Sequence, residues 1–135
     1  LITTHTHTCF TNHGEGTVEE LVSAAVAAGV STIAVTEHYP MTATFDPDRS
    51  LSMPAERMGE YLAAVEAVRE AHPEIEVLVG CEMDWLGDDE DRVITAEDVA
   101  PFQLIWARCI SSTAGFDDPA QAPLTRWADL IWRRY

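Results

Sequence analysis

The sequence is poor in basic residues, and this shortage excludes several binding functions. Lysine and arginine together number 8 against 23 acidic residues, which gives a formal net charge of −15. We therefore expect no contact with nucleic acid, whose phosphates need a basic surface, and none with an anionic membrane. If the substrate is an anion, a bound metal ion rather than lysine and arginine must attract it.

Cysteines and long apolar runs are also scarce. The three cysteines are too few, and odd in number, for a disulfide scaffold. No apolar run approaches the roughly 20 residues of a membrane span, and the chain does not open with the basic start and apolar stretch of a signal peptide. We therefore expect a cytoplasmic protein with reduced thiols.

Three common sequence motifs are missing. No G-x-G-x-x-G follows the first predicted strand, which disfavours a dinucleotide-binding fold. The phosphate loop G-x-x-x-x-G-K-[ST] of nucleotide-binding proteins does not occur either. Since the sequence has no C-x-x-C pair, a closed structural zinc site is not expected.

Signals for strands and helices alternate along the chain. The 135 residues, 47% of them hydrophobic, are enough for one domain over residues 1–135. Thr17 and Glu20 form a capping box that starts a helix, and Gly29 ends it. We expect strands at 1–8, 30–36, 75–80 and 102–107, and helices at 17–29, 54–71, about 95–99 and within 124–131. This order is typical of an α/β protein with a parallel sheet, and an open doubly wound sheet and part of a (βα) barrel both fit.

Two histidines close the first predicted strand. His5 and His7 lie two residues apart, so their side chains point to the same face, with Cα atoms roughly 6–7 Å apart. Two imidazoles can converge on one ion over that distance. The alternative is a surface ladder of threonine and histidine, which is less plausible for a strand that we expect to be central and buried on both faces.

The other predicted strands also end in possible metal ligands. Glu37 and His38 follow the second strand, Glu82 follows the third, and the fourth ends near Cys109. Sites in α/β folds are built at the carboxyl ends of the strands, so we expect a metal site there, with Asp84 lining the pocket. Imidazole and carboxylate ligands suit Zn, Fe or Mn better than Mg or Ca. Such a set can hold more than one ion, because a carboxylate can bridge two.

Longer stretches of the sequence resemble the PHP (polymerase and histidinol phosphatase) family. "THTHTCFTNHGEGTVEELVSAAVAAGVSTIAVTEHYPM" resembles the start of the family, and "TEHYPM", "GCEMDW", "GFDDP" and "WRRY" resemble its histidinol-phosphatase branch in the same order. The resemblance implies a (βα)7 TIM-like barrel with a metal cluster at the carboxyl ends of its strands. This chain would hold about four βα units of that barrel, which is therefore incomplete.

The resemblance also implies a set of ligands and an activity. The residues that match family metal ligands are His5, His7, His13, His38 and Glu82. Glu82 would be the bridging carboxylate. With His38 and Glu37 it would form the catalytic group, in which Glu37 would orient a ligand or contact the substrate. The implied reaction is the hydrolysis of L-histidinol phosphate, a small phosphorylated substrate, to histidinol and phosphate in histidine biosynthesis. A metal-activated hydroxide would attack the phosphorus.

Two features depart from the family pattern. The family's fourth strand usually ends in a "GSVH"-like segment whose histidine binds metal, and here "IWARC" places Cys109 near that position. A cysteine thiolate can bind zinc, or else Cys109 is a small buried residue and one metal position is lost. Family members are also markedly longer, and their later ligands have no counterpart before Tyr135.

These departures leave alternatives open. Either the chain is a piece of a longer protein or a second copy completes the barrel, since a half-barrel exposes sheet edges and an apolar face that favour association. A metal-binding or assembly module without catalysis is the alternative to an enzyme. A third possibility is a PHP-type phosphoesterase that acts on nucleic-acid phosphodiesters, which the acidic charge disfavours.

Overall fold

A computed structural model describes residues 1–85 and 95–109 of the protein. Strands and helices alternate along these ranges, as the sequence predicts. In chain order they are β1 (Ile2–Thr3), α1 (Val18–Ala27), β2 (Thr32–Val35), the 3-10 helix η1 (Ala55–Arg57), α2 (Met58–Ala71), β3 (Glu76–Trp85), α3 (Ala96–Val99) and β4 (Leu104–Cys109). The predicted helix within 124–131 and the segments "GFDDP" and "WRRY" lie outside the described residues.

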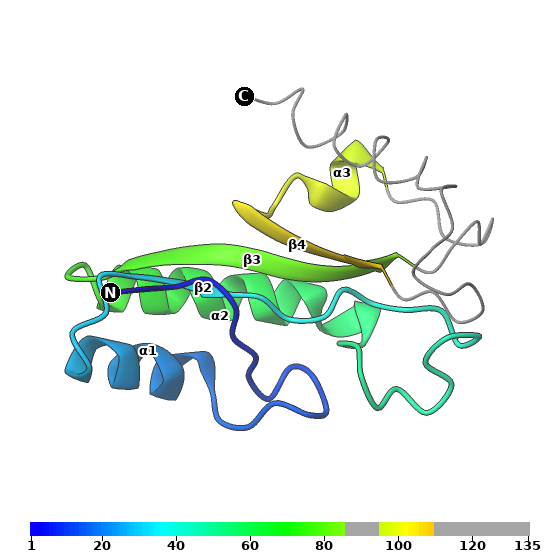
Figure 1. Ribbon diagram of the computed structural model, residues 1–135, viewed down its shortest axis with the longest axis horizontal. Helices are drawn as coiled ribbons and strands as arrows, with labels where there is room; N and C mark the ends of the chain where they lie inside the picture. The colour runs from blue at the N-terminus through cyan, green and yellow to red at the C-terminus, as the bar shows by residue number, and fades with distance from the viewer. Residues whose placement is uncertain (86–94, 110–135) are drawn as a thin grey trace.

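The strands form a parallel sheet in the order β1-β2-β3-β4. Helices α1 and α2 lie on one side of this sheet, and α3 lies beyond β4 on the other side (Figure 1). The sheet curls, since the Trp106 indole N–H in β4 donates a hydrogen bond of 2.5 Å to the Thr4 carbonyl just after β1. The predicted α/β architecture is confirmed, and the curled sheet is part of a TIM-like barrel.

The first strand is much shorter than the predicted range 1–8. Its ladder to β2 stops after Thr3. Beyond that point one backbone bond, from the Thr36 N–H to the Thr6 carbonyl (2.9 Å), and several threonine hydroxyls join the two segments. The Thr6 N–H donates to the Thr36 hydroxyl (3.0 Å), and the Thr6 hydroxyl donates to the Ala34 carbonyl (2.7 Å). The expectation of a central strand buried on both faces is also wrong for the described sheet, where β1 is at the edge and Ile2 is 64% exposed.

The third strand is longer than the predicted range 75–80, because it pairs with different strands along its length. Its first four residues pair with β2, and its last six, from Gly80 onward, pair with β4. An isolated parallel bridge joins His38 to Glu82 just beyond the end of β2. Glu82 therefore lies inside β3 rather than after it, at the level where β2 has ended.

Local sequence signals set the ends of the helices. The Thr17 hydroxyl accepts the Glu20 N–H, and the Glu20 carboxylate accepts the Thr17 N–H, so the predicted capping box starts α1. Gly29 follows the helix with φ of 73°, a left-handed conformation that glycine adopts without strain. The predicted helix 54–71 starts as η1 and continues as α2. No helix in the described ranges has the length and apolar character needed to cross a bilayer.

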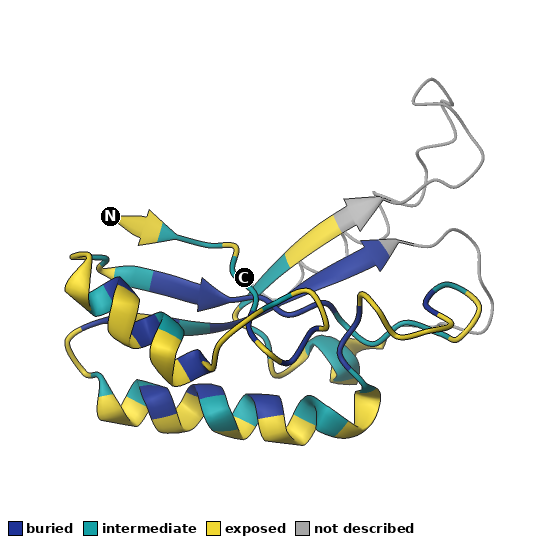
Figure 2. Ribbon diagram, turned by 90° about the horizontal axis from the view of Figure 1, so that it is seen from below, coloured by how far each residue is buried: buried dark blue, intermediate teal, exposed yellow. Residues whose placement is uncertain are grey.

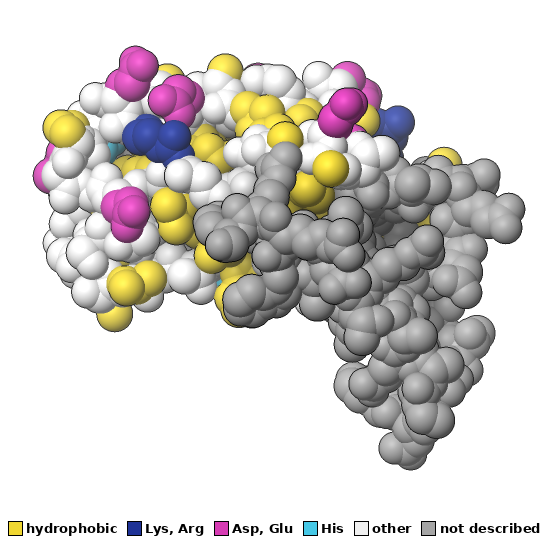
Figure 3. Space-filling model, turned by 90° about the horizontal axis from the view of Figure 1, so that it is seen from above, with side chains coloured by type: hydrophobic (Ala, Val, Ile, Leu, Met, Phe, Trp, Pro, Cys, Tyr) yellow, Lys and Arg dark blue, Asp and Glu magenta, His cyan; other side chains and the backbone are white. Residues whose placement is uncertain are grey.

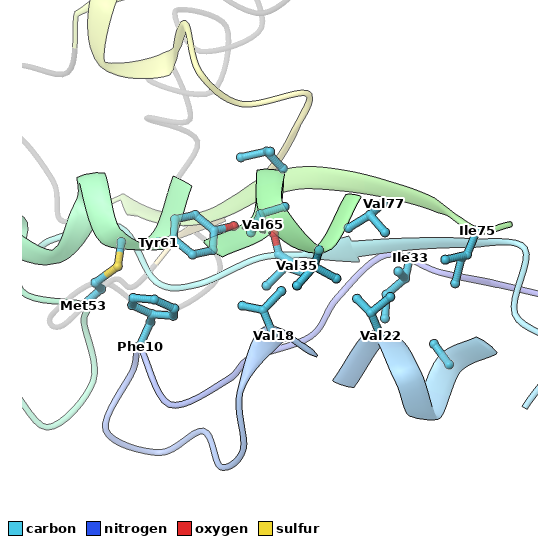
Figure 4. Packing of buried hydrophobic residues seen from close by; sticks show 13 residues of the cluster. Phe10, Val18, Val22, Ile33, Val35, Met53, Tyr61, Val65, Ile75 and Val77 are labelled. Carbon is cyan, nitrogen blue, oxygen red and sulfur yellow. Dashed lines mark hydrogen bonds between the residues drawn. The ribbon is translucent and has the colours of Figure 1, made fainter. Parts of the chain in front are cut away.

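The hydrophobic core fills the space between helices α1 and α2 and strands β2 and β3 (Figure 4). Its most deeply buried members include Val22, Ile33, Val35, Tyr61 and Val65. Both helices carry buried residues along one stripe and exposed residues along the opposite one (Figure 2). This packing fixes β2 and β3 relative to each other and so fixes the polar groups at their ends.

Tyr61 joins the core to the two central strands and offers a first test of the packing. Its hydroxyl donates to the Val35 carbonyl and the Gly80 carbonyl, each at 2.8 Å. Burial raises the pKa of Tyr61, so the phenol stays protonated and remains a donor. Tyr61→Phe should lower the free energy of unfolding by about 1–3 kcal/mol, measured by urea denaturation. An unchanged midpoint would contradict this role.

Candidate metal centre

Three imidazoles converge on one carboxylate oxygen beyond the ends of β1 and β2. Glu82 Oε2 lies 3.0 Å from His5 Nε2, 3.2 Å from His7 Nε2 and 3.4 Å from His38 Nε2. These histidines come from the segments after β1 and β2, while Glu82 comes from the middle of β3. Because parallel strands run in the same direction, segments distant in sequence meet at one edge of the sheet.

His13 joins this cluster from the loop between β1 and α1. Its ring centroid is 5.0 Å from that of His7 and 5.0 Å from that of His38. Turn hydrogen bonds shape the loop: the Thr11 N–H donates to the Thr8 carbonyl, and the Gly14 N–H donates to the Thr11 carbonyl, each at 3.2 Å. The loop therefore folds back and brings His13 close to His7 and His38.

Asp84 has a larger part in the cluster than the sequence indicated. It was expected to line the pocket, but its Oδ2 lies 3.0 Å from His38 Nδ1, and the residue is buried. Asp84 is two residues beyond Glu82 in the same strand, so both side chains point to the same face of β3. The E-x-D spacing of Glu82 and Asp84 was the only sequence signal for this contact. It places both side chains on one face only if the strand continues past Gly80.

Glu37 lies behind the histidines and is shielded from water. Its side chain is 0% exposed, and its Oε1 accepts the Thr8 N–H and the Thr8 hydroxyl, each at 2.7 Å. Burial raises the pKa of Glu37, although the hydrogen bonds from Thr8 oppose the shift. Glu37 is thus held rigidly and does not face solvent.

The electrostatic surroundings keep His7 neutral. Burial, followed by the nearby imidazoles of His38, His5 and His13, lowers the pKa of His7 to about 4. A neutral imidazole has one nitrogen with a free lone pair, which is the form that binds metal ions.

Two further residues, both in β4, complete the comparison with the predicted site. Cys109 is the last residue of β4 and pairs with Trp85 in the sheet register, but its side chain lies outside the described part of the structure. The proposed role of Cys109 as a ligand therefore stays a prediction. Trp106, which the sequence analysis did not single out, places its ring 5.5 Å from the His5 ring.

The donor atoms fit a divalent metal ion in distance and in chemistry. Within the described residues they form the groups His7–His13–His38, His5–His7–Glu82 and His38–Glu82–Asp84, each with its ligand atoms within 4.8 Å of one another. Two nitrogen or oxygen ligands bound to one ion at about 2.0–2.2 Å lie roughly 3.0–3.5 Å apart. The contacts of 3.0–3.4 Å around Glu82 fall in that range. The three groups overlap, since they share His7, His38 and Glu82.

Comparison with known proteins agrees with the fold. The sequence pattern of the PHP domain family matches residues 3–131. A protein of Deinococcus radiodurans named "Probable histidinol-phosphatase" is 33% identical over 86 residues, which are 63% of this chain and 32% of that protein. A crystal structure from Listeria monocytogenes, described as a "putative histidinol phosphatase", superposes with a TM-score of 0.69 at 21% identity and covers 79% of this chain and 44% of its own. The chain thus spans less than half the length of either protein.

Proposed function

Since the chain belongs to the PHP domain family, we propose that it forms the metal-binding part of a phosphatase that hydrolyses L-histidinol phosphate to histidinol and phosphate. One observation carries this proposal: three imidazole nitrogens lie within 3.4 Å of a single Glu82 oxygen. The name of the Deinococcus radiodurans relative supports the substrate.

The proposed ligands are His5, His7, His13, His38 and Glu82, with Zn, Fe or Mn as the ion. A bound divalent ion supplies charge that favours an ionised water and polarises phosphoryl oxygens. Glu82, which belongs to two of the three ligand groups, would share its carboxylate between ions and keep them close together. His38, with its Nδ1 facing Asp84, would present Nε2 to the same position.

Charge explains why such a site needs the ion. The chain has a net charge of −15, which repels a phosphate monoester, and the cluster itself contains carboxylates. The face seen in Figure 3 carries separate acidic and basic side chains rather than a continuous basic stripe in its described part. This arrangement favours a small phosphorylated substrate over a nucleic-acid phosphodiester.

The experiment that tests the function combines metal analysis with a phosphate-release assay on histidinol phosphate. We expect at least one ion per chain, phosphate release that chelation abolishes, and recovery when Zn²⁺, Mn²⁺ or Fe²⁺ is added back. Glycerol 3-phosphate is the control substrate and should react more slowly. Equal rates on both substrates would contradict the proposed specificity.

The length of the relatives supports a second candidate. The chain covers 32% of the Deinococcus protein and 44% of the Listeria chain, so further barrel strands, from the same protein or from a second copy, would be needed to complete the site. A metal-binding module without catalysis is therefore the alternative. Full metal occupancy without phosphate release, in the monomer and in any oligomer separated by size-exclusion chromatography, would favour that module.

A further inference from the structure

Two buried polar atoms behind the metal cluster face each other without a hydrogen bond. Among the described residues, His7 Nδ1 and Glu37 Oε2 have no hydrogen-bond partner, and they lie 3.9 Å apart. A buried polar atom left unpaired costs about 1–3 kcal/mol. Two such atoms side by side therefore indicate an interaction that closes in the functional state.

Thr8 determines which oxygen of Glu37 is available for His7. The Thr8 N–H and hydroxyl both donate to Oε1, and Thr8 is itself fully buried. The carboxylate cannot rotate without losing both bonds, so Oε2 stays directed at the imidazole. A shift of roughly 1 Å would bring Oε2 and His7 Nδ1 to hydrogen-bond distance.

His38 shows the same arrangement with its interaction already formed. Its Nδ1 lies 3.0 Å from Asp84 Oδ2, while its Nε2 points to Glu82. His7 likewise points Nε2 to Glu82 and Nδ1 to a buried carboxylate. Both histidines thus have a carboxylate behind the ring and the shared Glu82 oxygen in front of it.

We propose that Glu37 is a positioning residue that accepts a hydrogen bond from the Nδ1–H of His7 and thereby leaves the Nε2 lone pair for a metal ion. Asp84 does the same for His38. A carboxylate acceptor requires a proton on Nδ1, which fixes the tautomer and the ring orientation. Glu37 therefore acts through His7 and does not contact the substrate, which agrees with its complete burial. This inference rests on the proposed metal centre and is independent of the phosphatase reaction.

The first test needs no substitution. Two-dimensional ¹⁵N–¹H NMR of the histidine rings in the full chain assigns the tautomer of each neutral imidazole. We expect His7 in the Nδ1–H form, both without metal and with Zn²⁺ added. His7 in the Nε2–H form in the metal-free protein would overturn the proposal, whether or not the protein hydrolyses any phosphate.

The second test uses Glu37→Gln. Since Thr8 donates twice to one terminal atom of residue 37, the amide oxygen must face Thr8, and the NH₂ group must face His7. The NH₂ group would then donate to Nδ1 and move the ring proton to Nε2, where it competes with the metal. We expect Zn²⁺ affinity, measured by calorimetry with the metal alone, to fall roughly 10–100-fold.

Glu76→Gln is the matched control, because Glu76 also accepts a threonine hydroxyl, that of Thr32 at 3.0 Å, but lies on the exposed surface. It should leave Zn²⁺ affinity unchanged. Wild-type affinity in a folded Glu37→Gln protein would overturn the proposal. So would the loss of one bound ion per chain at saturation, since Glu37 would then be a ligand itself. If the variant does not fold, the tautomer of the unsubstituted protein still decides.

Discussion

Glu82→Gln should weaken metal binding by more than about 100-fold and abolish phosphate release. A carboxylate that orients a metal ligand without binding the metal contributes roughly 10–100-fold to metal affinity. A carboxylate that binds the metal directly, as proposed for Glu82, must contribute more. Glu82 is the only residue whose one oxygen contacts three imidazole nitrogens among the described residues. Replacing it removes the negative charge that those contacts surround.

Burial makes the loss difficult to repair. Glu82 is 4% exposed, so water has little access to take its place as a ligand. The amide retains the shape of the carboxylate but is neutral, and its NH₂ group cannot bind a cation. Isothermal calorimetry with Zn²⁺ measures the affinity, and elemental analysis measures the number of ions per chain.

A thermal shift gives an independent measurement of the same effect. A ligand at 100 times its Kd stabilises the native state by about 2.7 kcal/mol, so added Zn²⁺ should raise the Tm of the unsubstituted chain. The Glu82→Gln chain should show little rise. Glu66→Gln is the control, since Glu66 is an exposed carboxylate paired with Arg69 at 2.8 Å and should respond to Zn²⁺ as the unsubstituted chain does. A normal rise in Tm for Glu82→Gln would exclude Glu82 as a ligand.

The grouping of the histidines could be predicted because it depends on only two features of the sequence. Ligand residue types occur near the ends of predicted strands, and parallel strands bring those ends to one edge of the sheet. These features were enough to predict that His5, His7, His38 and Glu82 lie close together, as they do in the structure. His13 needed the family resemblance, because nothing in the composition of its loop indicates that the loop folds back.

The roles of Asp84 and Glu37, the carboxylates behind the histidine rings, could not be predicted in the same way. The contact of Asp84 with His38 depends on β3 continuing beyond Gly80, and that continuation depends on β4, which lies some twenty residues later in the sequence. The contact of Glu37 with Thr8 joins the segments that follow β1 and β2, after the short β1 has ended at Thr3. Both are effects of tertiary pairing, and neither follows from local propensity.

Gly14→Ala should strongly destabilise the fold, because the structure leaves no room for a side chain at this position. A Cβ atom added at Gly14 would lie 2.1 Å from the Thr8 carbonyl oxygen and 2.9 Å from the Thr8 nitrogen. Both are backbone atoms, which cannot move aside as the end of a flexible side chain can. We expect the free energy of unfolding to fall by at least about 1–3 kcal/mol, the usual cost of overpacking.

The effect should extend to metal binding, and this separates the loop's role from simple stability. Thr8 holds Glu37 behind His7, and Gly14 follows His13 directly, so displacing Thr8 from Gly14 disturbs both sides of the cluster. Gly14→Ala should therefore weaken Zn²⁺ binding in calorimetry at temperatures where circular dichroism shows a folded chain. Unchanged affinity and stability would contradict the close approach of Gly14 to the Thr8 backbone.

Gly59→Ala provides the control of opposite sign. Gly59 lies in the first turn of α2, and a Cβ atom there meets nothing within 4 Å. Alanine loses less backbone entropy on folding than glycine, so this variant should gain about 0.5–1 kcal/mol in the free energy of unfolding and bind Zn²⁺ as before. The same chemical change, one added methyl group, thus destabilises the chain where the loop crosses Thr8 and stabilises it on the open helix. The sign of the difference depends only on the space around each glycine.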